Sequence, residues 1–327
     1  MIGAFRLFAV TLGRFRLRNA PPTVMKHSHF KPINQLTQSL YFKYSSNMET
    51  ALIHRLSTLS HPQRMAVFRL LMRRCPDALP AGEIAQALSL KPSTASVYLA
   101  ALTQAGMISQ RRDGTRLLYS VNLDATREVV SDLFFDCCRG RADLCPPQYA
   151  DMLAGISPSS GQKYNVLFIC TGNSARSIFA ETILRDMAGD KFTAYSAGTK
   201  HQSALNPFAV EMLKSKGHDI SPLRSKNISE LQGPDAPKMD FVFTVCDHAA
   251  NEECSTWPGQ PVSGHWGMAD PVKAQGTDAE KRLAFQQTYG ALHNRISAFT
   301  SLSFEALDRA ALQKHVDDIG RTKPTGD

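Results

Sequence analysis

The most constraining feature of the sequence is an apolar run that ends in a polar turn and continues at once as a helical pattern. Residues 164–170, YNVLFIC, have the composition of a buried strand, and residues 177–187, SIFAETILRDM, repeat apolar positions at helical spacing. Two more strand-like runs, 192–198 and 240–246, alternate with helical segments, and a fourth strand is expected near 262–266. This alternation predicts a doubly wound α/β domain with a parallel sheet of four strands, whose ligands bind at the carboxyl ends of the strands.

The turn after the first strand, CTGNSARS, gathers backbone donors around a cysteine. It places Cys170 at the strand end and Arg176 at the start of the helix, with five residues between them. The unpaired N–H groups of a helix N-terminus and the Arg176 guanidinium can surround a tetrahedral oxyanion. The same dipoles are expected to hold the pKa of Cys170 well below its ordinary value, which makes this residue a candidate nucleophile. Ser177 can donate a hydrogen bond to the thiolate and Asn173 can brace the loop; the remaining loop residues are Thr171, Gly172, Ser174 and Ala175.

Residues 163–300 resemble the low-molecular-weight phosphatases, which have a flavodoxin-like fold, and CTGNSARS is nearly the signature loop of that family. The loop does not distinguish these phosphatases from thioredoxin-coupled arsenate reductases, which share it. The segment TVCDHAANEECSTWPG resembles the reductase branch, because it adds Cys246 at a strand end and Cys254 eight positions later. The segment SGHWGMADP is also similar to the reductases. Asp270-Pro271 is followed by Val272, where phosphatases usually have an aromatic residue.

The resemblance implies a relay of thiols. Cys170 attacks arsenate, Asp270 protonates the departing oxygen as a general acid, and Cys246 then attacks the adduct and forms a disulfide with Cys170. Cys254 attacks Cys246 in turn, and thioredoxin or a similar thiol donor reduces the final disulfide. No tightly bound cofactor is expected. Two alternatives stay open: a low-molecular-weight protein-tyrosine phosphatase with a regulatory DNA-binding domain, and a regulator whose enzyme domain only binds oxyanions.

The N-terminal half has helical patterns followed by one hairpin. AGEIAQALSL and STASVYLAALTQAGM predict a helix–turn–helix whose second helix begins at an N-cap, Ser93 or Thr94, and ends at Gly106. ISQRRDGTRLLYSVN predicts a hairpin that turns at Asp113-Gly114. Together they predict a winged helix, mainly α with a β wing. Its second helix would read base edges and its wing would contact phosphates; the candidate residues are Ser93, Ser96 and Tyr98 on the helix and Arg111, Arg112 and Arg116 on the wing.

Residues 50–145 resemble the arsenic-responsive (ArsR) repressors in LSHPQRMAVFRLL, EIAQALSLKPSTASVYLAALTQAGMI and RRDGTRLLYSVN. The resemblance implies a homodimer, formed through this domain, on near-palindromic operator DNA. Many members carry a Cys-x-Cys metal site on the first helix of the helix–turn–helix, and it is absent from LPAGEIAQAL. The segment DCCRGRADLCPP instead offers Cys137, Cys138 and Cys145, and three thiolates suit thiophilic arsenite as the effector. The alternative for these residues is inert packing as small hydrophobic groups.

The composition indicates a basic N-terminal leader and a cellular location. Of the 37 Lys and Arg residues, seven lie in residues 1–47, which hold none of the 29 Asp and Glu residues. This leader resembles an organelle transit peptide; alternatively it is upstream sequence and Met48 is the first residue of the protein. The odd count of seven cysteines and the lack of a secretory signal favour a reducing, cytoplasmic location. No apolar run reaches the roughly 20 residues of a membrane span, so no membrane association is expected.

We therefore expect a fused, bifunctional arsenic-resistance protein. An arsenite-responsive repressor would be joined to an arsenate reductase, and arsenite would be both the product of one part and the effector of the other. The expected segments are a disordered leader (1–47), a winged-helix domain (48–147), a linker (148–163), the reductase domain (164–302), and a C-terminal helix and tail (303–327).

Overall fold

The computed structural model describes residues 49–138, 163–200, 204–233, 235–252, 257 and 260–322. Two of the seven cysteines, Cys145 and Cys254, lie outside these residues, as does the predicted leader, and so do residues 148–162 of the predicted linker.

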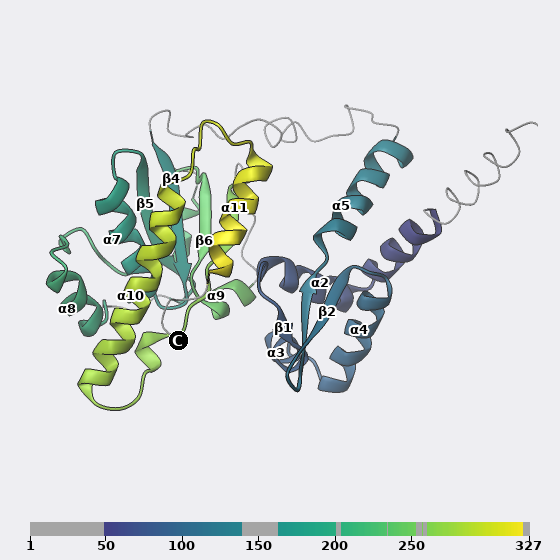
Figure 1. The fold of residues 1–327 in the computed structure, drawn as a ribbon, viewed down its shortest axis with the longest axis horizontal. Helices are drawn as coiled ribbons and strands as arrows, with labels where there is room; N and C mark the ends of the chain where they lie inside the picture. The colour runs from purple at the N-terminus through teal and green to yellow at the C-terminus, as the bar shows by residue number, and fades with distance from the viewer. Residues whose placement is uncertain are drawn as a thin grey trace, which may run out of the picture. The chain divides into compact units, whose positions relative to one another are not determined.

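The helical part has the order of elements that the sequence predicts for a winged helix. After a first helix at residues 49–59, its elements are α2 (Pro62–Arg73), β1 (Leu79–Pro80), α3 (Ala81–Ala87), α4 (Pro92–Gln104), β2 (Ile108–Asp113), β3 (Arg116–Val121), α5 (Leu123–Ser131) and a π-helical turn η1 (Asp132–Cys137). The strands form an antiparallel sheet in the order β1-β3-β2. The predicted helix–turn–helix and wing are confirmed, and β1 is an additional short strand (Figure 1).

Two local details of this part differ from the sequence prediction. Helix α4 begins at Pro92 with Lys91 as its N-cap, so neither Ser93 nor Thr94 caps it. Proline favours the first position of a helix, because its fixed φ suits the helix and it has no N–H to leave unpaired. The hairpin loop is Gly114-Thr115, one residue later than expected, because Asp113 still pairs with Arg116.

The helices of this part bury a core of their own. Leu70 and Leu71 of α2, Ile84 of α3, and Leu99 and Leu102 of α4 are completely buried against one another. In α2 the buried Leu70 and Leu71 follow the buried Val67 by three and four residues, and in α4 Ala95, Leu99 and Leu102 are four and three residues apart, so both helices turn one apolar face inward.

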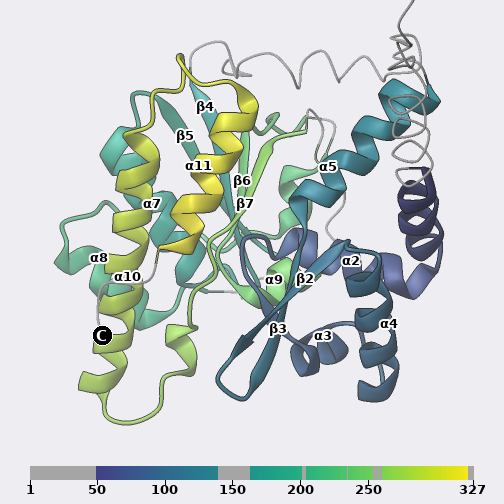
Figure 2. The ribbon, with the colours of Figure 1, turned by 45° about the vertical axis from the view of Figure 1, so that its right-hand side comes forward.

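The C-terminal part is a parallel sheet of four strands covered by helices. The strands are β4 (Tyr164–Cys170), β5 (Phe192–Gly198), β6 (Phe241–Thr244) and β7 (Val262–His265), in the order β5-β4-β6-β7 (Figure 2). The helices are α7 (Arg176–Ala188), α8 (Pro207–Ser215), α9 (Asp247–Asn251), α10 (Asp278–Thr300) and α11 (Arg309–Arg321), with short 3₁₀ turns η3 (Ile228–Leu231) and η4 (Pro271–Lys273). The predicted α/β fold is confirmed.

All seven residues of β4 are buried, because β4 has a strand on each side and helices on both faces. Parallel strands share an orientation, so β4 and β6 leave the sheet at the same edge, where Val245 N–H still donates to Ile169 O at 2.8 Å. The residues that follow these strands, from Cys170 and Cys246 onward, therefore meet at one edge.

Aromatic packing joins the end of the sheet to the C-terminal helix α11. The ring of Trp266, just after β7, stacks on Phe243 with a centroid separation of 4.0 Å, and its indole N–H donates to Val316 O at 3.1 Å. Trp266, Val316 and Leu312 are fully buried, so α11 belongs to the core of the sheet. Among the residues that the structure describes, none of the helices is both long and apolar enough to span a membrane.

Candidate active site

The loop between β4 and α7 is wound around the Cys170 sulfur. Asn173 adopts the left-handed conformation, with φ of 46°, and its backbone N–H donates to Cys170 Sγ at 3.1 Å. Ser177, in the first turn of α7, also contacts the sulfur, with Oγ 2.9 Å from Sγ. The N-cap of α7 is Ala175, which has no side chain to satisfy the N–H groups of the first turn. These groups remain available to an anion, as the sequence predicts.

Burial sets the acidity of the nucleophile. The Cys170 side chain is only 3% exposed, and this burial, together with the neighbouring Cys246, raises the pKa of the Cys170 thiol above its ordinary value. The Ser177 hydrogen bond, the Arg176 charge and the Asn173 N–H lower it, but they do not outweigh burial. The lowered pKa expected from the sequence is therefore wrong for this structure, because desolvation disfavours the thiolate more than the loop stabilises it.

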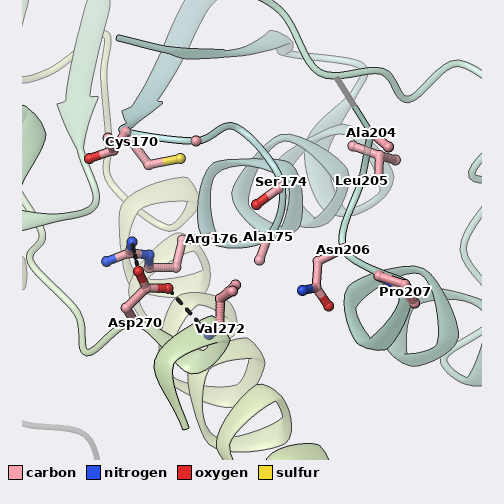
Figure 3. A pocket seen from close by; sticks show the side chains of 12 residues that line it. Cys170, Ser174, Ala175, Arg176, Ala204, Leu205, Asn206, Pro207, Asp270 and Val272 are labelled. Atoms are coloured by element: carbon pink, nitrogen blue, oxygen red, sulfur yellow. Dashed lines mark hydrogen bonds and ion pairs between the residues drawn. The ribbon is translucent and has the colours of Figure 1, made fainter. Parts of the chain in front are cut away.

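Arg176 and Asp270 form an ion pair on one wall of the pocket. The Arg176 guanidinium donates to Met268 O at 3.1 Å, and its Nη2 lies 2.9 Å from Asp270 Oδ2 (Figure 3). Asp270 also accepts a hydrogen bond from Val272 N–H at the start of η4, which fixes the carboxylate at the rim of the pocket. The structure thus brings the predicted cation and the predicted acid to the loop that holds Cys170.

The pocket has a volume of about 470 Å³, ample for a tetrahedral oxyanion. One wall, which the sequence analysis missed, consists of residues 204–207 at the start of α8 (Figure 3). Asn206 caps α8 by accepting from Phe208 N–H at 2.9 Å, and its backbone N–H donates to Ser174 O at 2.9 Å. An Asn before a Pro is a recognisable helix start, but only the fold shows that this start lies against the loop.

Cys246 is the second thiol of the site. It lies just beyond β6, is 1% exposed, and its sulfur is within hydrogen-bond distance of Thr171 Oγ1, at 3.4 Å. The same sulfur accepts from Ala249 N–H at 3.4 Å and so caps helix α9. Asp247, the next residue, contacts the buried His265, whose Nε2 is 3.2 Å from Asp247 Oδ1. His265 thereby positions the start of α9.

Three groups of candidate residues lie in the winged helix or near its end. Ser93 and Ser96 are exposed on α4, and the wing residues Arg111, Arg112 and Arg116 are all exposed. Tyr98 is half-buried and packs against His61, with a ring separation of 5.1 Å, so it offers only part of its surface to DNA. Cys137 is exposed and Cys138 is half-buried, where the π-helical turn ends.

Cys75, between α2 and β1, belongs to none of these groups. Burial raises the pKa of its thiol to about 11, which fits a structural residue.

Comparison with known proteins identifies both parts. The low molecular weight phosphotyrosine protein phosphatase family matches residues 165–316, and a helix-turn-helix domain matches residues 59–111. The arsenate reductase of Halalkalibacterium halodurans is 40% identical over 136 residues, which are 41% of this chain and 93% of that protein. The arsenate reductase of Bacillus subtilis is 40% identical over 135 residues, which are 41% of this chain and 93% of that protein. The arsenate reductase of Bacillus licheniformis is 38% identical over 138 residues, which are 42% of this chain and 95% of that protein.

The fold and the site define the C-terminal part as a cysteine-dependent enzyme domain of the low-molecular-weight phosphatase class. Within that class, the chain belongs to the arsenate reductase family, and it carries a helix-turn-helix domain in addition. Both resemblances drawn from the sequence are confirmed at this level.

Proposed function

We propose that this protein reduces arsenate to arsenite and represses transcription until arsenite binds to it. The observation that carries the reductase part is the presence of two buried thiols at one edge of the sheet. Cys170 lies inside an oxyanion loop, and Cys246, at the end of the neighbouring strand, contacts that loop through Thr171. Hydrolysis of a phosphate ester needs only the first thiol, whereas a two-electron reduction needs a second one.

The first step is attack on arsenic. Arsenate enters the pocket with its oxygens toward the loop N–H groups and Arg176, and the Cys170 thiolate attacks the arsenic atom. A hydroxyl group of arsenate leaves as water after accepting one more proton from Asp270, whose carboxyl lies on the pocket wall beside Arg176. A sulfur–arsenic bond forms and an arsenic–oxygen bond breaks.

The second step transfers two electrons. Cys246 attacks the Cys170 sulfur, a disulfide forms, and arsenite departs with the electron pair of the sulfur–arsenic bond. Cys254 then attacks Cys246, which releases the Cys170 thiolate, and a dithiol donor of the thioredoxin kind reduces the Cys246–Cys254 disulfide. The role of Cys254 rests on its sequence position alone. The need for free thiols supports a reducing, cytoplasmic location.

The regulatory part rests on the winged helix. Exposed Arg111, Arg112 and Arg116 on β2 and β3 are suited to phosphate contacts beside an exposed face of α4. We propose that two copies bind an operator through α4 and the wing, and that arsenite bound by Cys137, Cys138 and Cys145 releases them. The domain that makes arsenite would then sit on the same chain as the sensor that responds to it.

A single-turnover assay on the purified full chain tests the enzymatic part. Wild-type protein should convert arsenate to arsenite in near-stoichiometric amount without added donor, and catalytically with thioredoxin. Cys246→Ser should abolish the reduction and leave any phosphate-ester hydrolysis intact. If phosphate esters are turned over and arsenate is not reduced by wild-type protein, the phosphatase alternative is correct.

A reporter assay tests the regulatory part in cells that lack other arsenate reductases. Arsenite should release the operator with wild-type protein and with Cys170→Ser, whereas arsenate should release it only with wild-type protein. Cys137→Ser should abolish both responses. Equal release by arsenate in wild type and Cys170→Ser would disprove the coupling between the two parts.

A further inference from the structure

Helix α4 of the winged helix presents an uncharged face to solvent. After Pro92, its exposed residues recur at three- and four-residue spacings, opposite the buried Ala95, Leu99 and Leu102. These exposed residues are Ser93, Ser96, Val97, Ala100 and Gln104. The helix, PSTASVYLAALTQ, contains no Asp, Glu, Lys or Arg. It therefore lacks the arginine and lysine side chains that most often read guanine in the major groove.

The polar side chains of α4 offer few hydrogen bonds to base edges. Ser96 Oγ donates its single proton to Pro92 O at 3.0 Å, so it can only accept from a base. The Tyr98 ring is half-buried against His61. Gln104 stands at the last position of the helix, whereas helix–turn–helix proteins read bases chiefly with the N-terminal residues of this helix. Hydrogen bonding alone therefore gives this face little means of distinguishing base pairs.

Val97, in the second turn of α4, stands at the middle of the exposed face. Its side chain is 65% exposed, which is the largest fraction for any large apolar side chain in the part of the chain that the structure describes. A β-branched residue at this position favours neither the helix, whose propensity it lowers slightly, nor the core, which it does not contact. Ala100, one turn later, is exposed on the same face, so the two side chains form a small apolar patch.

The major groove of DNA contains one apolar group that such a patch can recognise, the C5-methyl group of thymine. Charge complementarity supports DNA as the occupant of this face. Exposed Lys91 directly precedes the helix, and exposed Arg111, Arg112 and Arg116 follow it on the wing. These cations are suited to phosphates, which position the protein without reading sequence, and the uncharged helix is left to contact the bases.

We propose that Val97, with Ala100 beside it, reads the C5-methyl group of a thymine in the operator and is a specificity-determining residue of the winged helix. The proposal rests on the proposed function in that α4 enters the major groove of operator DNA. It assigns to an apolar contact the readout that the sequence analysis expected from Ser96 and Tyr98. Each half-site of the operator should then hold a thymine at one fixed position.

The test begins with an operator that the purified full chain selects from random DNA duplexes in the absence of arsenite. Each thymine is then replaced in turn by deoxyuridine, which keeps every hydrogen-bonding group and lacks only the methyl. In fluorescence anisotropy, wild-type protein should bind about 4-fold more weakly when one particular thymine of a half-site is replaced, as the loss of one buried methyl implies. Val97→Ala should bind the unmodified operator more weakly, and deoxyuridine at that position should cause it little further loss, because the methyl has lost its partner.

Val130→Ala is the matched control, since Val130 is an exposed valine on a different helix, α5. Whatever this variant does to the overall affinity, the deoxyuridine penalty at the sensitive thymine should persist. A penalty that stays undiminished in Val97→Ala would overturn the proposal.

Two outcomes separate this proposal from the repressor function on which it rests. If the full chain selects an operator in which no thymine is sensitive to deoxyuridine, the readout by Val97 is refuted and the repressor function stands. If the full chain enriches no sequence at all, the repressor function fails and the readout by Val97 fails with it.

Discussion

Gly198, the last residue of β5, should be the most sensitive small residue near the oxyanion loop. A Cβ added at this position would lie 2.7 Å from Thr171 O and 3.1 Å from both the backbone N and the Cβ of Asn173. The first of these contacts is with backbone, which cannot rotate away as a flexible side chain can. Carbon and carbonyl oxygen normally approach to about 3.3–3.6 Å, so Gly198→Ala requires the loop to move by roughly 0.6–0.9 Å.

The size of the effect follows from that displacement. Overpacking of this kind costs about 1–3 kcal/mol of the free energy of unfolding. Displacement of reacting groups by about 1 Å can reduce a rate on the order of 100-fold. Gly198→Ala should therefore remain folded, and its rate of single-turnover arsenate reduction should fall by roughly 10- to 100-fold. Urea denaturation and the single-turnover assay measure the two quantities separately.

Gly264→Ala in β7 is the matched control. Its Cβ would lie 2.5 Å from Val316 Cγ1 and 3.1 Å from the Phe243 ring, so it too overpacks the core, but it contacts no residue of the loop. It should lose a similar amount of stability and keep its rate of reduction. If Gly198→Ala retains the wild-type rate, or if Gly264→Ala loses as much activity, the reasoning from loop displacement is refuted.

Three further predictions concern other parts of the chain. Arg176→Lys should weaken binding of inorganic phosphate about 10-fold or more in calorimetry, because an ammonium cannot clamp two oxygens; unchanged affinity would exclude the clamp. The pKa of the Cys75 thiol is about 11 in the folded protein, against an ordinary value of 9.0. The contribution of this thiol to the free energy of unfolding should therefore be intact below pH 9 and be lost as the pH rises toward 11. Urea titration at several pH values should show a smaller fall in stability for Cys75→Ala. Arg111→Ala and Arg112→Ala should each reduce the salt slope of operator binding by about 1, and an unaltered slope would remove that residue from the phosphate contacts.

The parallel sheet could be predicted because each strand is an apolar run bounded by polar turns, as in residues 164–170. The loop could be predicted because Cys170 and Arg176 stand where a strand passes into a helix. The sequence analysis placed the N-cap of α4 at Ser93 or Thr94, because these residue types favour caps. The helix instead begins at Pro92, because proline favours the first position of a helix.

Other features depend on contacts between distant segments, which no local pattern reports. The acidity of Cys170 was misjudged because the dipoles of the loop are visible in the sequence, whereas the burial that opposes them results from packing against β5 and β6. The wall at residues 204–207 is likewise formed by residues that approach the loop only in the folded state. The roles of the sensor cysteines and of Cys254 stay predictions.

The burial of α11 in the core of the sheet has a consequence for synthesis on the ribosome. The helical part closes its own core with residues that precede 139, whereas the sheet cannot complete its core until Leu312 and Val316 have been made. At translation rates of roughly 5–20 residues per second, the intervening stretch takes about 10–40 s. A nascent chain would thus present a finished DNA-binding fold well before its catalytic half can form.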